Sequence, residues 1–173
     1  MTDKQVKILK AALVLFAEQG YEATSTSKVA KEAGVSEGLI FRHFNSKEGL
    51  LNAIRALINA SAIRGFDDVL TRKDPKAIIR GVLEFPFTID DDKFLLWKLI
   101  YSIQWQKGTY ENTIYAPIQE VLITAFDTLG YVDPEAEADA VLMLFDGIAT
   151  AVLLKNQKNQ EGVLKAILEK YQL

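Results

Sequence analysis

The sequence predicts an all-α fold, and three observations support that prediction. Apolar residues recur three and four positions apart over most of the 173 residues, as the buried face of an amphipathic helix requires. No stretch of useful length alternates apolar and polar residues, as a half-buried strand would. Glycine, proline and small polar residues that cap helices separate the apolar periods from one another.

Four helices are predicted in the N-terminal third of the chain. The first ends at Gly20, the second covers Ser25–Ala33, and a turn at Gly34 separates it from a third, which Ser36 caps and which runs to Phe44. A fourth helix begins at Asn45-Ser46. The apolar faces of the first, second and fourth helices are formed by Val6, Leu9, Leu13 and Phe16, by Val29, Ala30 and Ala33, and by Leu50, Leu51, Ile54, Leu57 and Ile58.

The remaining residues predict five more helices, each with a recognisable start or end signal. An aspartate followed by a proline, or a run of aspartates, supplies a cap and a favourable charge at several of the starts. Phe85-Pro86-Phe87 is expected to break the first of these helices. The helices are expected from Asp74-Pro75 to Leu83, from Asp90-Asp91-Asp92 to about Gly108, from Pro117 to Gly130, from Asp133-Pro134 to about Asn156, and over Glu161–Tyr171.

The composition is that of an ordinary globular chain, with 49% hydrophobic and 25% charged residues. The absence of cysteine excludes a disulfide framework and a thiolate metal site. The chain shows neither a basic and apolar leader segment nor an uncharged apolar run of about 18 residues. We therefore expect a cytoplasmic protein that does not associate with a membrane.

Residues 24–50 predict a helix-turn-helix, because they contain a helix, a tight turn and a second short helix. Gly34 suits the turn, since a side chain there would penalise the required backbone conformation. In such a motif the second helix enters the major groove of DNA. If Ile40 and Phe44 form its buried face, a rotation of about 100° per residue points Gly38, Leu39 and Arg42 furthest outward, with Glu37, Phe41 and His43 on the flanks.

Each outward residue type suits a contact with DNA. Gly38 permits a close approach of the backbone, Leu39 suits a thymine methyl group, and Arg42 suits a guanine edge or a phosphate. Glu37 is suited to accept a hydrogen bond from a cytosine amino group, or it acts as a negative selector beside phosphates.

The N-terminal segment resembles the DNA-binding domain of the TetR family of regulators. The resemblance covers residues 8–51 and lies in ILKAALVLFAEQGYEATS, residues 8–25, and VAKEAGVSEGLIFRHFNSKEGLL, residues 29–51. It implies a phosphate contact for Thr26, a capping role for Ser36, base-facing positions for Glu37, Gly38 and Leu39, a backbone contact for His43, and a phosphate contact for Lys47.

Three residues depart from the pattern of the TetR family. Phe41 stands where the family usually has a tyrosine whose hydroxyl binds a phosphate, so the packing is kept and that hydrogen bond is lost. Glu37 and Leu39 replace the commoner lysine and threonine. These departures affect which operator sequence the protein is expected to bind and how tightly it binds that DNA.

The charge is unevenly distributed along the chain. Residues 1–66 carry nine Lys/Arg and six Asp/Glu, a balance of +3, whereas residues 67–173 carry eleven and seventeen, a balance of −6. A mildly basic N-terminal part suits phosphates, although ordinary surface variation explains the difference equally well. His43 is the one histidine, and no partners at catalytic or metal-ligand spacing accompany it, so we expect no enzyme, no metal and no cofactor.

An aromatic stripe predicts either a ligand pocket or a packed core. Phe94, Trp97, Tyr101 and Trp105 recur on one helix face, and Phe85, Phe87, Tyr110 and Tyr115 lie near them in sequence. The resemblance to the TetR family favours a small apolar or amphipathic ligand bound there. The negative balance of the C-terminal part favours a neutral or cationic compound.

Two later segments, 121–129 and 138–154, predict a homodimer. The segment 138–154 is apolar over much of its circumference. The core of one monomer is not expected to bury all of this apolar surface. The small residues Gly147 and Ala151 would allow a close crossing of two helices, and the alternative is a single buried central helix. The interface is predicted to contain Val121, Ala125, Leu129, Val141, Phe145, Gly147, Ile148, Ala151 and Val152.

Together these features predict a helix-turn-helix DNA-binding domain over residues 1–50 and a helical effector-binding and dimerisation domain over residues 51–173. We expect a transcription regulator, a repressor released from a palindromic double-stranded operator by a small-molecule effector. The alternatives are a DNA-binding regulator without an effector and an all-helical carrier or enzyme.

Overall fold

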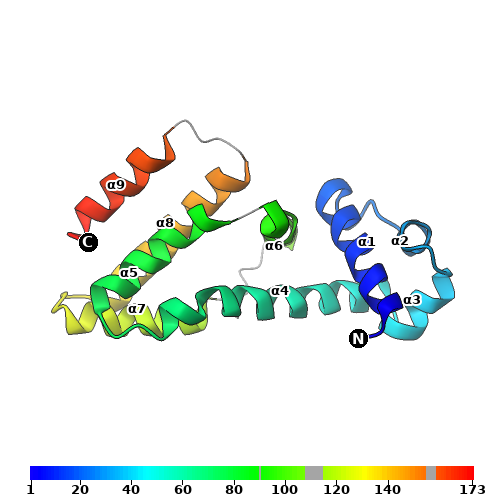
Figure 1. The fold of residues 1–173 in the computed structure, drawn as a ribbon, viewed down its shortest axis with the longest axis horizontal. Coiled ribbons are helices and arrows are strands. Elements are labelled where there is room, and N and C mark those ends of the chain that lie inside the picture. Colours follow the sequence, from blue (N-terminus) through cyan, green and yellow to red (C-terminus); the bar gives the residue numbers. More distant parts are fainter. Residues whose placement is uncertain (90, 108–114, 155–158) are drawn as a thin grey trace. The chain divides into compact units, whose positions relative to one another are not determined.

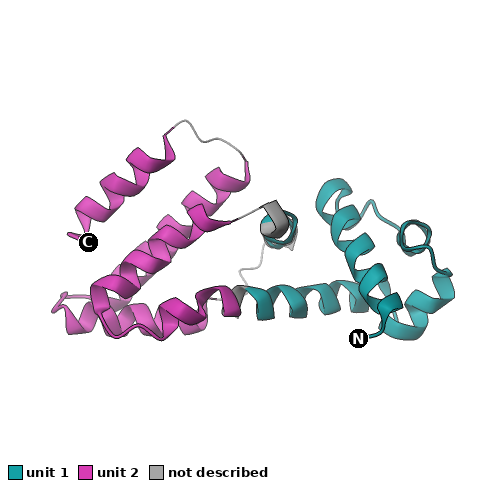
Figure 2. Cartoon of the chain, viewed as in Figure 1, with its two compact units in different colours: residues 1–61, 91–110 teal, residues 62–90, 111–173 magenta. Residues whose placement is uncertain are grey.

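The computed structural model describes residues 1–89, 91–107, 115–154 and 159–173, and every regular element in these ranges is a helix (Figure 1). The prediction of an all-α fold is confirmed. The chain forms two compact units, distinguished in Figure 2. Unit 1 comprises residues 1–61 and 91–110, and unit 2 comprises residues 62–90 and 111–173.

Unit 1 contains the three N-terminal helices and the start of the fourth. Its elements are α1 (Asp3–Gln19), α2 (Thr26–Ala33), α3 (Glu37–Phe44), the first part of α4 (Lys47–Leu70) and α6 (Asp91–Lys107). The predicted stop at Gly20 is confirmed, because this residue ends α1 with a φ of 87° that favours glycine. The core of unit 1 contains Ile8, Ala12, Phe16, Val29, Ile40, Leu50, Leu51 and Ile54.

The connection between α1 and α2 is fixed by a buried threonine. Only 1% of Thr24 is exposed, and its hydroxyl oxygen lies 2.9 Å from the carbonyl oxygen of Gly20 and 3.3 Å from that of Leu15. Ser25 then caps α2, because its side chain accepts a hydrogen bond from the backbone N–H of Lys28. The chain therefore enters α2 in a defined direction.

The junction between α3 and α4 needs a glycine. Ser46 accepts a hydrogen bond from the N–H of Gly49 at 2.9 Å, which confirms the predicted start of α4. A Cβ atom on Gly49 would lie 1.9 Å from the carbonyl oxygen of Phe44, so no side chain fits there. The two helices approach each other closely, and this approach fixes the end of α3.

Unit 2 contains the C-terminal helices. They are α5 (Pro75–Glu84), the 3₁₀ helix η1 (Phe85–Thr88), α7 (Ala116–Thr128), α8 (Pro134–Leu153) and α9 (Gln160–Lys170). The predicted caps Asp74 and Asp133 are confirmed, since each carboxylate accepts from a backbone N–H in the first turn that follows. α7 packs against α8, and α5 contacts both of them (Figure 1).

Aromatic side chains fill the middle of unit 2. Phe66 stacks on Phe85 with ring centroids 3.9 Å apart, and the ring of Phe145 lies 5.8 Å from that of Phe66. Tyr115 meets Phe145 edge to face at 5.9 Å. The hydroxyl of Tyr115 donates to a carboxylate oxygen of Asp146 at 2.7 Å, which satisfies the polar end of a side chain that is only 1% exposed.

The described helices differ from the predictions in two places. Phe85-Pro86-Phe87 does not end the helical segment outright, because η1 continues α5 for four residues as a tighter helix. α8 ends at Leu153, whereas the predicted end near Asn156 lies outside the described residues.

The compact units follow bounds that differ from the predicted domains. α4 is one continuous helix that contributes residues to both units, and α6 belongs to unit 1. The predicted domains, residues 1–50 for DNA binding and residues 51–173 for effector binding and dimerisation, are defined by function and not by compactness. They remain a proposal.

Candidate functional site

The turn between α2 and α3 is built around Gly34. Its φ of 65° and ψ of 37° lie in the left-handed region, which confirms the predicted reason for a glycine. The N–H of Val35 donates to the carbonyl oxygen of Ala30 at 3.0 Å and closes the turn. α2 and α3 contact each other directly, so residues 26–44 form a helix-turn-helix.

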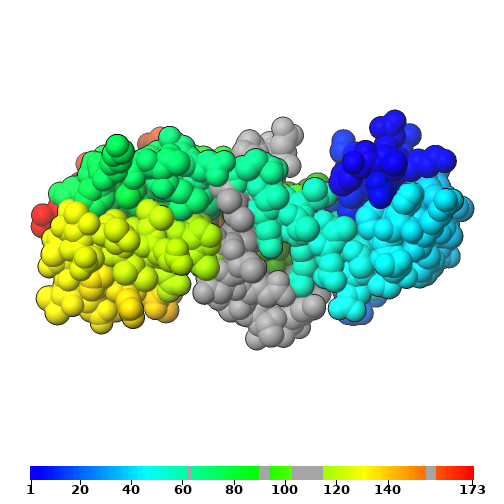
Figure 3. All heavy atoms as spheres, turned by 90° about the horizontal axis from the view of Figure 1, so that it is seen from below, coloured from blue at the N-terminus to red at the C-terminus, as the bar shows by residue number. Residues whose placement is uncertain are grey.

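α3 is buried on one face and exposed on the other. Ile40 is fully buried and Phe44 is 9% exposed, as the sequence predicts. The exposed positions form the outer face of α3, and Figure 3 shows the side chains of α3 and of the start of α4 (light blue to cyan) at the surface in view. The outer face of α3 consists of Glu37, Gly38, Phe41 and Arg42.

Two positions on α3 differ from the rotation estimated from sequence. Phe41 was expected on a flank but is 46% exposed, whereas Leu39 was expected to point outward and is half-buried. His43 is half-buried, as a flank position implies. A helical wheel cannot show which flank a neighbouring helix covers, and here the covered flank lies on the Leu39 side.

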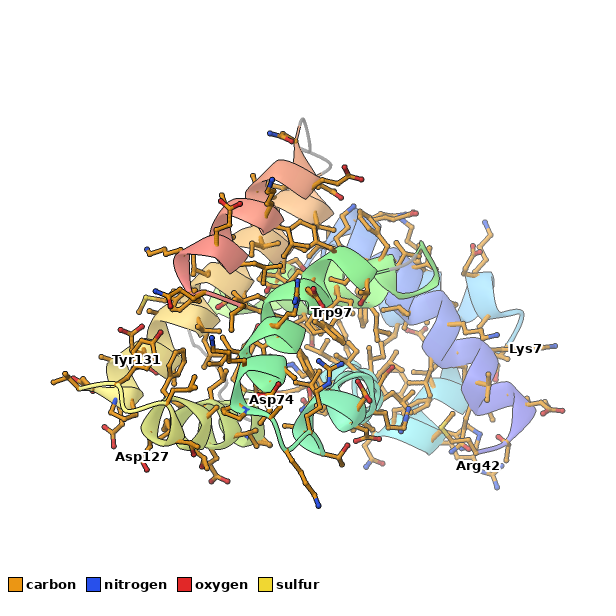
Figure 4. All side chains as sticks on the ribbon, turned by 60° about the vertical axis from the view of Figure 1, so that its left-hand side comes forward. Lys7, Arg42, Asp74, Trp97, Asp127 and Tyr131 are labelled. Carbon is orange, nitrogen blue, oxygen red and sulfur yellow. The ribbon has the colours of Figure 1, made fainter. Side chains whose placement is uncertain are left out.

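Arg42 supplies the positive charge on the outer face of α3. It is exposed, and Figure 4 shows its side chain extending outward from the helix. A guanidinium group in this position presents several N–H donors to a phosphate or a guanine edge.

Lys47 is held at the start of α4 by the loop that follows α1. Its ammonium group donates to the carbonyl oxygen of Glu22 at 3.3 Å and lies 4.2 Å from the centroid of the Tyr21 ring. Burial, followed by the nearby carboxylates of Glu22 and Glu48, raises the pKa of the Tyr21 phenol, so the ring stays uncharged. Sequence reasoning missed Tyr21, because no periodicity links it to Lys47.

Ser36 lacks the capping contact that was predicted, and Thr26 is hydrogen-bonded within the chain. Ser36 occupies the N-cap position of α3 and is exposed, but its side chain makes no capping hydrogen bond, so the predicted capping contact is wrong. The hydroxyl of Thr26 donates to the carboxylate of Glu37 at 2.5 Å. Two predicted DNA contacts are therefore bonded to each other in the chain without DNA.

The surroundings of Gly38 and its backbone conformation do not require a glycine. A Cβ atom built there would meet no atom within 4 Å, and its φ is not in the left-handed region. A glycine inside a helix costs roughly 1 kcal/mol relative to alanine. Since no contact in unit 1 requires this glycine, the position is suited to a molecule that approaches the α3 backbone closely.

The predicted ligand-binding residues are divided between the two units. Phe94, Trp97 and Tyr101 lie on α6 in unit 1, where Trp97 (labelled in Figure 4) is 2% exposed. Phe85 and Phe87 lie in η1 and Tyr115 directly precedes α7, all in unit 2. Tyr110 and the side chain of Trp105 lie outside the described residues.

The predicted dimer residues fall into three groups by exposure. Val141 and Phe145 are fully buried, and Ala125 and Ile148 nearly so, because they pack inside unit 2. Gly147 is exposed, and the half-buried members are Val121, Leu129, Ala151 and Val152. Exposed apolar surface on α8 comes from Met143, which is 73% exposed, and from Leu154 just beyond the helix, with the same exposed fraction.

Gly147 resembles Gly38 in its surroundings. A Cβ atom at Gly147 would meet no atom within 4 Å, although the residue lies in the interior of α8. A face that combines Gly147 with exposed apolar side chains is suited to contact a second helix.

The described residues contain neither a cluster of metal-ligand side chains nor a membrane-spanning helix. In the described ranges no three His, Cys, Asp or Glu side chains lie together as a metal site requires. No helix there is long and apolar enough to cross a bilayer.

Residues 8–54 match the family described as bacterial regulatory proteins, tetR family. The HTH-type transcriptional regulator YuxN of Bacillus subtilis is 31% identical over 113 residues, which cover 65% of this chain and 38% of YuxN. The HTH-type transcriptional repressor AcnR of Corynebacterium glutamicum is 35% identical over 89 residues, which cover 51% of this chain and 45% of AcnR. The matched regions span 25% to 45% of the lengths of the curated relatives.

Solved structures share the fold over nearly the whole chain. A transcriptional regulator from Saccharomonospora viridis in complex with choline superposes with a TM-score of 0.76 and 20% identity, covering 99% of this chain and 96% of its own. The fatty acid degradation regulator FadR from Bacillus halodurans superposes with a TM-score of 0.72 and 19% identity, covering 98% and 94%. At such identities the similarity shows the fold alone.

The first prediction concerns Gly38. Gly38→Ala should raise the free energy of unfolding by about 0.5–1 kcal/mol, because alanine favours the helix and the added methyl group meets no atom. Chemical denaturation followed by circular dichroism measures the change. Gly34→Ala is the matched control and should lower stability by roughly 1–2 kcal/mol, since its φ of 65° penalises a side chain. A destabilised Gly38→Ala variant would show that the glycine serves the fold.

Proposed function

Because residues 8–54 match the family described as bacterial regulatory proteins, tetR family, we propose that the chain is a DNA-binding transcription regulator of that family. The outer face of α3 enters the major groove, and Arg42 and Lys47 supply positive charge to the bases and phosphates. The observation that carries this proposal is Gly38, an exposed helical glycine with free space around it on the face that would meet DNA. The relatives named above are transcription regulators, in agreement with the prediction that the chain is not an enzyme.

The regulator acts as a homodimer on a palindromic operator. Two recognition helices reach successive major grooves about 34–36 Å apart only if two copies associate symmetrically. We place the contact on the side of α8 that carries Gly147 and the exposed Met143, with Ala151 and Val152 beside them. The buried Val141 and Phe145 support this face from inside unit 2.

A small molecule controls the affinity of the regulator for DNA. The aromatic cluster of unit 2 brings Phe85, Phe145 and Tyr115 together. The Tyr115 hydroxyl donates to the carboxylate of Asp146, and rings beside a carboxylate suit an apolar or amphipathic neutral or cationic compound. The complex of the Saccharomonospora viridis regulator with choline supports a ligand of this kind. The competing interpretation, a regulator without an effector, is supported by the complete burial of Phe66 and Phe145.

The effector would act through α4. This helix contributes residues to both units, so a shift of its last turns in unit 2 displaces its first turns beside α3. Loss of the correct spacing between two recognition helices costs the dimer its simultaneous contacts. We therefore propose repression that is relieved by the ligand.

The second prediction tests the DNA contacts. Arg42→Ala and Lys47→Ala should each weaken binding to duplex DNA and lower the slope of log affinity against log salt by about one per lost phosphate contact. Titration of labelled duplex at several salt concentrations measures both quantities. Lys165→Ala on α9 removes the same charge from unit 2 and should leave both unchanged. Unaltered slopes in both N-terminal variants would exclude the proposed surface.

The third prediction tests the dimer. Gly147→Glu should weaken self-association at least tenfold, because a charged side chain replaces the closest approach between helices, while the free space around Gly147 leaves the monomer intact. Sedimentation equilibrium gives the dissociation constant. Lys7→Glu on the exposed side of α1 serves as the control for a change of charge. If Gly147→Glu dimerises like the wild type, this face of α8 is not the interface.

The fourth prediction tests the effector site with choline as the probe. Choline should raise the thermal unfolding midpoint and weaken duplex binding, and at a hundredfold excess over its Kd it should stabilise the chain by about 2.7 kcal/mol. Asp146→Asn should reduce both effects, because the amide still accepts from Tyr115 but carries no charge. Asp127→Asn, an exposed residue of α7, is the control. Absence of any effect of choline would favour the solid-core alternative.

A further inference from the structure

A short hydrogen bond joins the first residues of the two helices of the helix-turn-helix. Thr26 is the first residue of α2, and Glu37 is the first residue of α3. The hydroxyl oxygen of Thr26 lies 2.5 Å from carboxylate oxygen Oε1 of Glu37, a distance typical of a hydroxyl that donates to an ionised carboxylate. The two residues are 11 positions apart, so the bond depends on the turn at Gly34.

This bond changes what each residue offers to DNA. A threonine hydroxyl has one proton to donate, and here Glu37 accepts it, so Thr26 has no proton left for a phosphate oxygen. The carboxylate of Glu37 has two oxygens with several acceptor positions, and Thr26 uses one of them. Glu37 therefore keeps acceptor capacity at the DNA-facing end of α3 while one of its oxygens is held in place.

Among the described residues, no cation neutralises the Glu37 carboxylate. Within the described ranges no Lys or Arg side chain lies at ion-pair distance from Glu37, and the ammonium group of Lys28, on α2, donates to Gln19. Glu37 is exposed, and the neighbouring Gly38 has no side chain to screen it. The charge is therefore available to whatever molecule meets the start of α3.

We propose that Glu37, held by Thr26, is a specificity-determining residue that accepts a hydrogen bond from the N4 amino group of a cytosine in the major groove. The first residues of a recognition helix contact base edges, which places Glu37 at the right end of α3. An acceptor without a proton suits the cytosine amino group and opposes the acceptors of guanine and thymine. This inference rests on the proposed DNA-binding function and adds a base preference to it.

Adenine is the second base with a major-groove amino group, and the geometry disfavours it. Adenine presents its N7 acceptor beside the N6 amino group, and a group that both donates and accepts matches that pair. The Glu37 carboxylate has no proton to give to N7. A glutamine at the same position has both functions, so Glu37→Gln is expected to exchange cytosine for adenine.

Selection of bound duplexes from a random pool tests the proposal. The full chain, Glu37→Gln, Thr26→Val and the control Glu32→Gln are each used to enrich duplexes, after circular dichroism has shown the same helical content for all four. Glu32 is an exposed carboxylate on α2, so the control makes the same chemical change at another place in unit 1. The affinity of each variant for one matched set of duplexes is then measured across salt concentrations.

We expect one cytosine in each half-site of the wild-type consensus to become adenine with Glu37→Gln, with a change in preference of roughly tenfold. Thr26→Val should reduce the preference for that cytosine several-fold and leave the salt dependence unchanged, because Thr26 makes no phosphate contact. Glu32→Gln should keep the wild-type consensus.

Three results would overturn the inference. An unchanged consensus with Glu37→Gln would show that Glu37 reads no base. A uniform loss of affinity over all duplexes with Thr26→Val, without a change in preference, would show that Thr26 binds a phosphate and not Glu37 in the complex. If the wild-type chain enriches no duplex at all, the proposed function fails as well, and this outcome differs from the other two.

Discussion

The burial of Ile40 and Phe44 is the contact on which the account of this protein depends. α3 has eight residues, and isolated helices of this length are marginal in water, so tertiary packing must hold it. The left-handed turn at Gly34 and the close approach at Gly49 fix its two ends. With the inner face held in this way, the remaining positions of α3 are free to serve a partner.

The outer face of α3 carries residues that the fold alone does not require. Gly38 gives up helix stability without relieving any contact, and Glu37 brings a negative charge to a surface that is proposed to meet phosphates. Phe41 exposes an aromatic ring, although burial would stabilise the fold more. Residues that lower stability and gather on one face, as these three do, indicate that the face serves binding.

Local sequence signals predicted the features that depend on neighbouring residues. The caps at Asp74 and Asp133 and the turn at Gly34 follow from residue types within a few positions of each other, and the structure confirms them. The predicted capping contact of Ser36 is wrong. The contact of Lys47 with Tyr21 and the bond between Thr26 and Glu37 join residues that only the folded chain brings together. For the same reason the apolar period of α8 could not separate Val141, which is buried in unit 2, from Gly147, which is exposed.

A directed cleavage experiment tests most directly whether α3 lies in the major groove. The chain has no cysteine, and Ser36 is exposed without a capping bond, so Ser36→Cys gives a single attachment point for iron–EDTA at the start of α3. On a bound duplex we predict two clusters of strand cleavage, related by two-fold symmetry, with the strand offset of a reagent in the major groove and a separation of about one helical turn. Diffuse cleavage, or clusters with the offset of the minor groove, would contradict the account.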